Sequence, residues 1–154
     1  MSPAEKKERA MTRILCPIRG GPQSQKAVDL AIELSISKNA KLMFLYIVDV
    51  DFLEHATVAR VNLMVAELKE TGHFALSILC DKARARGVDE VVAIIREGDI
   101  FEVILSVAEE SQVSHLVIGR PIRTPGIKSF SDKQFNKFLK SIEEASGLNI
   151  ECVE

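Results

Sequence analysis

The chain has 154 residues, of which 47% are hydrophobic and 27% are charged, and its formal net charge is −2. These values are typical of one globular domain. A charge this close to neutral gives no general attraction to nucleic acid or to anionic membranes, so either role would need a local basic patch. No apolar run reaches the roughly 20 residues of a membrane helix. The charged segment 1–11 lacks the apolar core of a signal peptide, so we expect a disordered tail there and a single domain over 12–154.

The first predicted strand is 13–18, RILCPI, a short apolar run that meets a turn cluster at Gly20 and Gly21. A helix should follow, because small and apolar residues recur at helical spacing, namely Ala27, Leu30, Ala31 and Leu34. We expect this helix to end at Asn39. A strand, a glycine turn and a helix in this order are typical of a mononucleotide-binding half-fold.

The second predicted strand is 41–50, KLMFLYIVDV, which is apolar on both faces as in a central parallel strand. A long helix is expected over 58–86, ended by Gly87. Its apolar stripe consists of Val61, Val65, Leu68, Gly72, Leu76, Leu79 and Ala83. Glycine in mid-helix is unfavourable by about 1 kcal/mol relative to alanine, so Gly72 should mark a bend or a close contact.

The third strand is expected over 90–96, and Asp99 with Glu102 gives the capping-box spacing for the next helix. The fourth strand is expected over 114–118. A basic loop follows, and Ser131 with Gln134 repeats the capping spacing for a helix that Gly147 should close. The last strand is expected over 149–153. Strict alternation of strands and helices predicts one parallel sheet, and therefore the α/β class.

Three cysteines, Cys16, Cys80 and Cys152, are far apart and odd in number. They form no CxxC pair, which argues against a disulfide framework and a structural zinc site. Each lies in an apolar run, so we expect buried thiols in a reducing cytoplasm.

Nearly the whole chain, from Thr12 to Val153, resembles the universal stress protein family. Four stretches carry the resemblance: Cys16–Gly21 with Ser24 and Ala27, Leu45–Asp49, Gly98–Asp99 with Ile104 and Ala108, and His115–Gly119. The resemblance implies a three-layer α/β/α sandwich with a five-stranded parallel sheet in the order 3-2-1-4-5, similar to adenine nucleotide alpha hydrolases. It also implies a cytoplasmic stress-response or regulatory protein that often forms a homodimer through the last strand. The backbone groups of an edge strand pair readily, so that dimer is physically reasonable.

The loop after the fourth strand departs from the motif of the members that bind ATP. Those members carry Gly-x2-Gly-x9-Gly-Ser/Thr, whose glycines and helix start hold phosphate. Gly119 matches the first position, but Ile122, Asp132 and Lys133 occupy the others. Arg19 also stands where ATP-binding members have an aspartate. These departures favour a degenerate pocket with no resident cofactor.

The same loops bring arginines to neighbouring strand ends, and this leaves an alternative open. Arg19, Arg120 and Arg123 would hold the anionic part of ATP or AMP by side-chain hydrogen bonds, with the loop re-registered onto Gly126 and Ser131. The competing interpretation is that the arginines are solvated or pair with Asp49, Asp51 or Asp99, as surface ion pairs commonly do.

We therefore predict a non-enzymatic regulatory protein, with an ATP- or AMP-binding member as the alternative. The candidate binding residues are Pro17, Arg19, Gly20, Val48, Gly119, Arg120, Arg123, Gly126 and Ser131. No residue is predicted to be catalytic or to bind a metal, because His55, His73 and His115 lack metal spacing and no nucleophile–base or Walker motif occurs. A basic run from Arg120 to Lys140 is a weaker indication of nucleic-acid binding, since its aromatics Phe135 and Phe138 fall on an apolar stripe.

Overall fold

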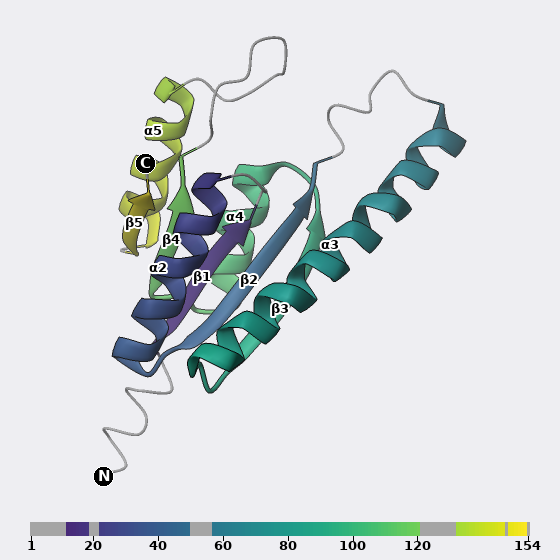
Figure 1. The fold of residues 1–154 in the computed structure, drawn as a ribbon. Coiled ribbons are helices and arrows are strands. Elements are labelled where there is room, and N and C mark those ends of the chain that lie inside the picture. The colour runs from purple at the N-terminus through teal and green to yellow at the C-terminus, as the bar shows by residue number, and fades with distance from the viewer. Residues whose placement is uncertain (1–11, 19–21, 50–56, 121–131, 147, 154) are drawn as a thin grey trace.

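The computed structural model describes residues 12–18, 22–49, 57–120, 132–146 and 148–153 (Figure 1). The elements in chain order are β1 (Arg13–Ile18), α2 (Pro22–Lys38), β2 (Lys41–Val48), α3 (Val58–Arg86), β3 (Val91–Glu97), α4 (Ile100–Glu110), β4 (His115–Gly119), α5 (Asp132–Ser146) and β5 (Asn149–Val153). The expected tail over 1–11 lies outside the described residues.

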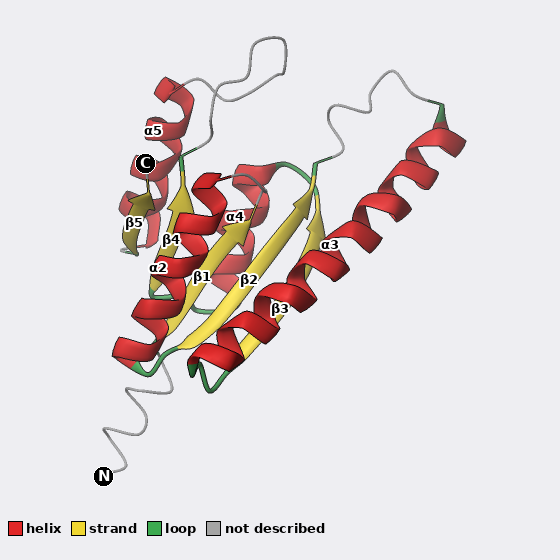
Figure 2. Cartoon of the chain, in the orientation of Figure 1, coloured by secondary structure: helices red, strands yellow, loops and turns green. Residues whose placement is uncertain are grey.

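The sheet has five parallel strands in the order β3-β2-β1-β4-β5. The predicted alternation and strand order are therefore confirmed. Helices cover both faces of the sheet, so the layers are α/β/α (Figure 2). Because each strand alternates its side chains between two covered faces, apolar residues are needed at successive positions.

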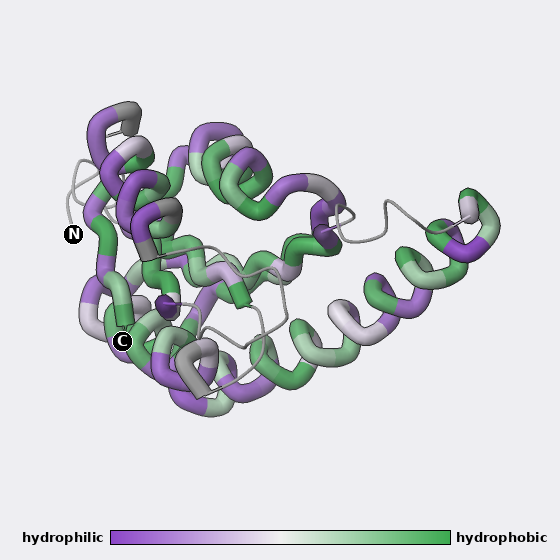
Figure 3. The backbone as a smooth tube through the Cα atoms, turned by 90° about the horizontal axis from the view of Figure 1, so that it is seen from above, coloured by the Kyte–Doolittle hydropathy of each residue, from purple (hydrophilic) through white to green (hydrophobic). Residues whose placement is uncertain are grey.

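The core consists of two clusters, one on each face of the sheet. The cluster under α2 and α3 includes Ile14, Phe44 and Ile32. The cluster under α4 and α5 includes Leu15, Leu45 and Ile142. All six side chains are at most 1% exposed. Seen from above, the apolar strands lie between helices that place hydrophilic residues outside (Figure 3).

The helix α3 matches its predicted bounds and carries the predicted glycine at its C-terminal end, together with an N-cap that was not predicted. The Thr57 side chain accepts a hydrogen bond from the backbone N–H of Arg60, and Gly87 adopts a left-handed φ of 110°. Buried residues of α3 lie only in its second half, at Gly72, Leu76, Cys80 and Ala83. The first half extends beyond the sheet (Figures 1 and 3). The predicted apolar stripe therefore lies on the buried side of α3, but its first three members are only partly buried, namely Val61, Val65 and Leu68.

The glycine in the middle of α3 marks a close contact. A Cβ atom added to Gly72 would lie 2.5 Å from Cδ1 of Tyr46 on β2. Real Cβ atoms do not approach that closely, so the absence of a side chain lets α3 lie against the Tyr46 ring. Of the two explanations for Gly72, the close contact is confirmed.

Several strand boundaries differ slightly from the sequence prediction. β2 ends at Val48 and not at residue 50, and the carbonyl of Val48 accepts a hydrogen bond from the N–H of Gly98 at 3.0 Å. β3 begins at Val91, one residue later than expected. β4 begins at His115, because the Ser114 hydroxyl bonds the backbone N–H and C=O of Arg13.

The termini of the helices α2 and α4 follow the sequence signals. Asn39 has a φ of 51°, which suits its expected place at the end of α2. The Asp99 carboxylate accepts hydrogen bonds from the backbone N–H groups of Phe101 and Glu102, as an N-cap should. The expected start and end of α5 at Ser131 and Gly147 lie outside the described residues.

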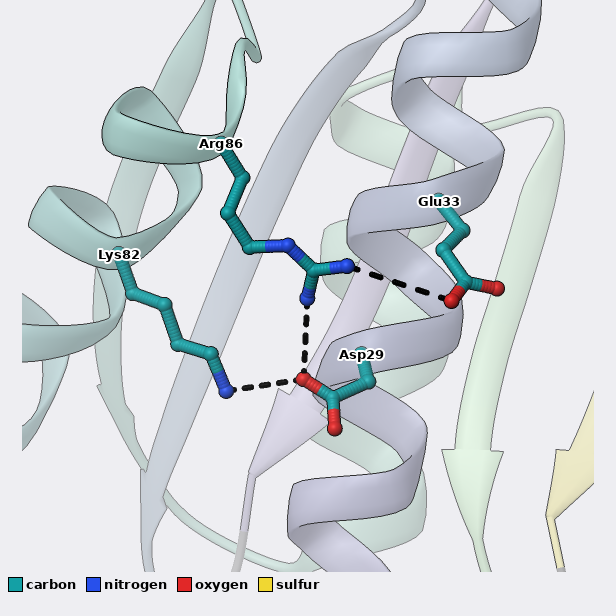
Figure 4. A network of polar contacts seen from close by, with 4 residues as sticks. All are labelled: Asp29, Glu33, Lys82 and Arg86. Carbon is teal, nitrogen blue, oxygen red and sulfur yellow. Dashed lines mark hydrogen bonds and ion pairs between the residues drawn. The ribbon is translucent and has the colours of Figure 1, made fainter.

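An ion network joins the helices α2 and α3 on one face of the molecule (Figure 4). Lys82 on α3 lies 2.8 Å from the Asp29 carboxylate of α2, and Arg86 lies 3.2 Å from the same oxygen. Arg86 also reaches Glu33 at 4.0 Å. The hydrogen bond from Lys82, supported by Arg86, lowers the pKa of Asp29. All four side chains are largely exposed, so the network orients the two helices more than it stabilises them.

Candidate functional site

The candidate site is the point at which the chain's strand order reverses, between the central strand β1 and its neighbour β4. From β1 the sheet continues to β2 on one side and to β4 on the other. In an open parallel sheet, ligands bind beyond the carboxyl ends of the strands at such a point. The residues expected at the site should therefore lie just past the ends of β1, β2 and β4.

The ladder between β1 and β4 is short. Its partners are Ile14 with His115 and Leu15 with Leu116, both near the amino ends of the strands. The N–H and C=O groups of a strand alternate between its two neighbours. The Arg13 carbonyl accepts from the Ser114 N–H of the β4 side at 3.0 Å, so the backbone of Pro17 also faces β4. Proline has no N–H to donate. Pro17 therefore interrupts the ladder where the strands approach their carboxyl ends.

The structure places Val48 and Gly119 at the carboxyl ends of β2 and β4, two residues and one residue from the ends that the sequence predicted. Val48 is 1% exposed, and its carbonyl is occupied by the Gly98 N–H. Gly119 pairs with Val153 of β5 in the register of the ladder. Pro17, Val48 and Gly119 thus lie on three adjacent strands, which supports their common location and leaves their role in binding a prediction.

Arg120 is held against α5 and β5. Its backbone N–H donates to the Val153 carbonyl at 2.8 Å. Its guanidinium donates from Nη2 to Oδ1 of Asn136 at 3.1 Å, and Cζ lies 5.1 Å from the centroid of the Phe135 ring. A cation over an aromatic face is attracted by the ring quadrupole. Arg120 therefore fixes the start of the loop to the helix that follows it.

The other candidate binding residues, Arg19, Gly20, Arg123, Gly126 and Ser131, lie outside the described residues. The same holds for Ile122, Asp51 and His55. The helix α5 begins at Asp132, so an acidic residue occupies the helix start at which a phosphate would lie.

The thiols of Cys16 and Cys80 are poor candidates for a nucleophile. Burial raises the pKa of Cys16 to about 12 and also raises that of Cys80. A thiol that stays protonated at neutral pH is a poor nucleophile. Cys152 is only partly buried, so the expectation that all three cysteines are buried is wrong for Cys152, because it lies on the edge strand.

The side chain of His115 has hydrogen-bond partners from the protein itself. His115 contacts the Ser114 hydroxyl through Nδ1 at 2.9 Å and the Asn149 amide through Nε2 at 3.5 Å. Burial, followed by the charge of Lys38, lowers the pKa of His115. Within the described residues no group of three or more His, Cys, Asp or Glu side chains is arranged to hold a metal.

Comparison with known proteins identifies the family. The model of the universal stress protein family matches residues 11–131. The chain belongs to the universal stress protein family. The comparison with curated proteins found no match.

Solved structures of this family share the fold. The universal stress protein UspA from Lactobacillus plantarum superposes with a TM-score of 0.71 at 17% identity, covering 94% of this chain and 99% of that one. A universal stress protein in complex with cAMP superposes with a TM-score of 0.65 at 19% sequence identity, covering 93% of this chain and 97% of that one. A family member from Arabidopsis thaliana with AMP bound superposes with a TM-score of 0.60 at 16% sequence identity, covering 92% of this chain and 90% of that one. At these identities the likeness establishes the fold.

Sequence reasoning missed the residues that anchor the loop. Phe135 was expected only as a core residue, and Asn136 was not singled out. Both depend on where α5 lies relative to Arg120, for which the sequence carries no local signal. The role of Pro17 in ending the β1–β4 ladder was also missed, although a proline within a central strand is such a signal.

Proposed function

We propose that this chain is a non-enzymatic regulatory protein of the stress-response type, acting in the cytoplasm without the ATP binding usual for its family. The observation that carries the proposal is the start of α5 at Asp132. A helix start favours one negative charge, and an aspartate there supplies it, so a phosphate at the same place would meet a like charge. Arg19 and Ile122 replace two further residues of the ATP-binding pattern.

A second candidate function is supported by the bound ligands of the related structures, cAMP and AMP. In this alternative the chain binds ATP or AMP with Arg19, Arg120 and Arg123 on the phosphate. Arg120 would have to exchange its contacts with Asn136 and Phe135 for the ligand, or reach it from there. The two candidates differ in a single measurable property, the affinity for nucleotide.

Isothermal titration calorimetry with ATP and with AMP, each with and without Mg²⁺, distinguishes the candidates. The proposed function predicts no binding in the micromolar range for either nucleotide, and micromolar binding would contradict it. If binding occurs, Arg19→Ala with Arg123→Ala should weaken it roughly 10- to 100-fold per lost charge-assisted contact. Arg84→Ala is the matched control, because Arg84 is an exposed cation in the last turn of α3. Equal affinity of the double variant and the control would rule out the arginines as ligands.

The homodimer is part of the proposed function. Among the described residues β5 is the last strand of the sheet and pairs with β4, and the backbone groups of an edge strand pair readily with those of another chain. Sedimentation velocity should show a dimer that Ile150→Pro dissociates, since proline removes a backbone donor from the edge. A dimer that survives this change would contradict pairing through β5.

A further inference from the structure

The strand β3 lies at the edge of the sheet opposite to β5. Among the described residues it is the outermost strand on that side, and it pairs with β2. The Glu90 carbonyl accepts from the Leu42 N–H at 2.9 Å, and the Gly98 N–H donates to the Val48 carbonyl at 3.0 Å. Backbone groups alternate in direction along a strand, so the groups of four residues of β3 point away from β2. These residues are Val91, Ala93, Ile95 and Glu97.

The side chains of β3 form an apolar run that is only partly covered. Val91 and Ile95 pack against the cluster under α2 and α3. Val92 and Ile94 pack against the cluster under α4 and α5. Ala93 between them is exposed, and of the five only Val91 is fully buried. An edge strand of this kind pairs readily with another chain.

The helix α3 extends past the same edge. Its first half lies beyond the sheet on the side of β3 (Figure 1). Val61, Val65 and Leu68 of this half continue the stripe that buries Gly72 and Leu76, but they are only partly buried. A strand added to β3 would extend the sheet toward this half of the helix, which offers it apolar surface.

The charges at the two ends of β3 have opposite signs. Glu90 precedes the apolar run and Arg96 follows it, and both side chains are exposed. When two identical strands pair antiparallel about a two-fold axis, the acidic end of each copy meets the basic end of the other. With Ala93 opposite itself, Glu90 lies opposite Arg96 of the second copy, twice per pair. Opposite charges at such positions stabilise a sheet.

The same register aligns the apolar residues of the two copies. Val91 lies opposite Ile95 of the second copy on the face that α3 covers, and Val92 lies opposite Ile94 on the face that α4 covers. Side chains branched at Cβ pack well against one another on a pleated surface. Ala93 at the axis presents only a methyl group to its copy, so nothing bulky separates the strands there.

The neighbouring registers place charged side chains opposite apolar ones. If Ile94 lies opposite itself, Arg96 meets Val92. If Val92 lies opposite itself, Glu90 meets Ile94. A charge placed against an apolar side chain loses contact with water and gains no partner. The sequence of the strand therefore selects the register centred on Ala93.

One pair of like charges lies at each end of this arrangement. Glu97 comes opposite Asp89 of the second copy, which is unfavourable for two acids. Lys69 of α3 forms an ion pair with Glu97 and offsets its charge. The repulsion at the ends is therefore weaker than the attraction between Glu90 and Arg96.

We propose that a second copy of this chain pairs with β3, antiparallel and with Ala93 opposite Ala93, so that Glu90 and Arg96 form ion pairs across the interface. This interface is separate from the β5 dimer of the proposed function and does not depend on it. It uses the opposite edge of the sheet.

Arg96 exchanges two contacts of the single chain for the new ion pair. Its Nη1 donates to the Ile95 carbonyl at 3.3 Å, and its Nη2 lies 3.8 Å from the Glu110 carboxylate. In the pair the Ile95 carbonyl accepts from the Val91 N–H of the second copy instead. Because this exchange offsets part of the gain, we expect the β3 pair to need a higher protein concentration than the β5 dimer.

Sedimentation velocity over a concentration series tests the β3 pair. Pairing at both edges of one sheet adds copies in a row, so the wild-type chain should pass from a dimer to larger species as its concentration rises. At the concentration where the wild type first dimerises, Ile150→Pro should be monomeric, and at higher concentration it should associate and stop at a dimer. An Ile150→Pro chain that stays monomeric throughout would overturn the β3 pair. A wild-type chain that associates no earlier than Ile150→Pro would overturn the β5 dimer alone.

Charge reversal in the Ile150→Pro background identifies the contact. Arg96→Glu should weaken the β3 pair roughly 2- to 30-fold for two cross-strand pairs, and adding Glu90→Arg to the same chain should restore it. Residues 90 and 96 of one strand are about 20 Å apart, so a rescue must come from the second copy. Glu110→Gln is the matched control, because it removes a contact of Arg96 within the chain and should not weaken the pair. A double variant as weak as Arg96→Glu would contradict the register.

Cysteine cross-linking tests the register without changing these charges. In a Cys152→Ser background, Ala93→Cys should give a covalent dimer on mild oxidation. The Cα atoms of a hydrogen-bonded pair at the axis are about 5.5 Å apart, within the range that a disulfide spans. Glu97→Cys is the control, because its two Cα atoms would be about 27 Å apart in this register. A covalent dimer of Glu97→Cys, or none of Ala93→Cys, would overturn the register.

Discussion

Gly72 and Tyr46 show how one missing side chain positions the longest helix on the sheet. The ring of Tyr46 occupies the space that a Cβ atom at Gly72 would fill. Gly72 is buried, and Tyr46 packs against the same core cluster as Leu76 and Ala83 of α3. The contact therefore sets how closely α3 approaches β2.

Gly72→Ala should lower the stability of the protein. Alanine is favoured over glycine in a helix by about 1 kcal/mol, but overpacking a core contact is unfavourable by about 1–3 kcal/mol. We expect a net loss of up to about 2 kcal/mol in the free energy of unfolding, measured by urea denaturation. Combining it with Tyr46→Leu should remove the penalty, and an equal loss in both backgrounds would contradict the contact.

The sequence indicates that Gly72 has a structural role but does not identify its partner. A glycine within a helical apolar stripe is unfavourable for the helix, so it points to a bend or a contact. The partner lies on β2, and its identity depends on how the helix crosses the sheet. Arg120 illustrates the same limit, because its contacts with Phe135 and Asn136 arise only from the placement of α5.

At the scale of elements, α2 and α3 are joined by the ion network around Asp29. The pKa of this carboxyl is lowered in the folded state by Lys82 and Arg86. A group with a depressed folded pKa stabilises the fold above its unfolded pKa and loses that contribution as the pH falls through the folded value. The contribution is modest, because the Asp29 side chain is 48% exposed.

Asp29→Asn should lower the free energy of unfolding slightly at pH 7, by up to about 1 kcal/mol. The difference from the wild type should begin to shrink below about pH 4, the ordinary pKa of an aspartate, and should be lost as the pH falls through the lower folded pKa of Asp29. It should also shrink in high salt. Thermal unfolding over a pH series measures it. Glu109→Gln serves as the control, since Glu109 is an exposed helical acid on α4. A pH-independent difference would mean that charge is not the cause.

Elements with strong local signals were predicted best. β1, α3 and β5 have the bounds that their apolar patterns and caps indicate. The ends of β2, β3 and β4 shifted by one or two residues, because hydrogen bonds between distant segments decide them. The Gly98 N–H donates a hydrogen bond to the Val48 carbonyl. The Ser114 hydroxyl forms hydrogen bonds with the backbone N–H and C=O of Arg13.

At the scale of the whole molecule, the sheet separates two hydrophobic clusters. Ile32 on α2 belongs to one cluster and Ile142 on α5 to the other. The two side chains belong to separate clusters and lie on opposite faces of the sheet.

Within the described residues no helix is both long and apolar enough to cross a membrane.

Ile32→Val and Ile142→Val should be additive in their effects on stability. Each should lower the free energy of unfolding by about 0.5–1.5 kcal/mol, and the double variant should match their sum to within about 0.5 kcal/mol. Chemical denaturation of the three variants measures this. Ile104→Val with Ile142→Val is the matched pair within one cluster, where departure from additivity is expected. Strong coupling across the sheet would contradict two independent cores.

The general position of the candidate site was predictable from the sequence, but five of its nine candidate residues, among them Arg19 and Arg123, lie outside the described residues. Alternation of strands and helices locates the carboxyl ends of β1, β2 and β4, and Pro17, Val48 and Gly119 lie at or next to these ends. Whether a pocket holds an anion depends on side chains of the loops around Arg19 and Arg123. Loop conformation follows from packing and ligand contacts more than from local sequence patterns.

The pairing of β1 with β4 has a consequence for how the chain folds during synthesis. β1 is the central strand, yet one of its two neighbours begins only at His115. Ribosomes add roughly 5–20 residues per second, so the β4 side of β1 stays unpaired for about 5–20 s after β1 has been made. During that interval an apolar strand edge is exposed, which is the state that chaperones bind and that misassembles most readily.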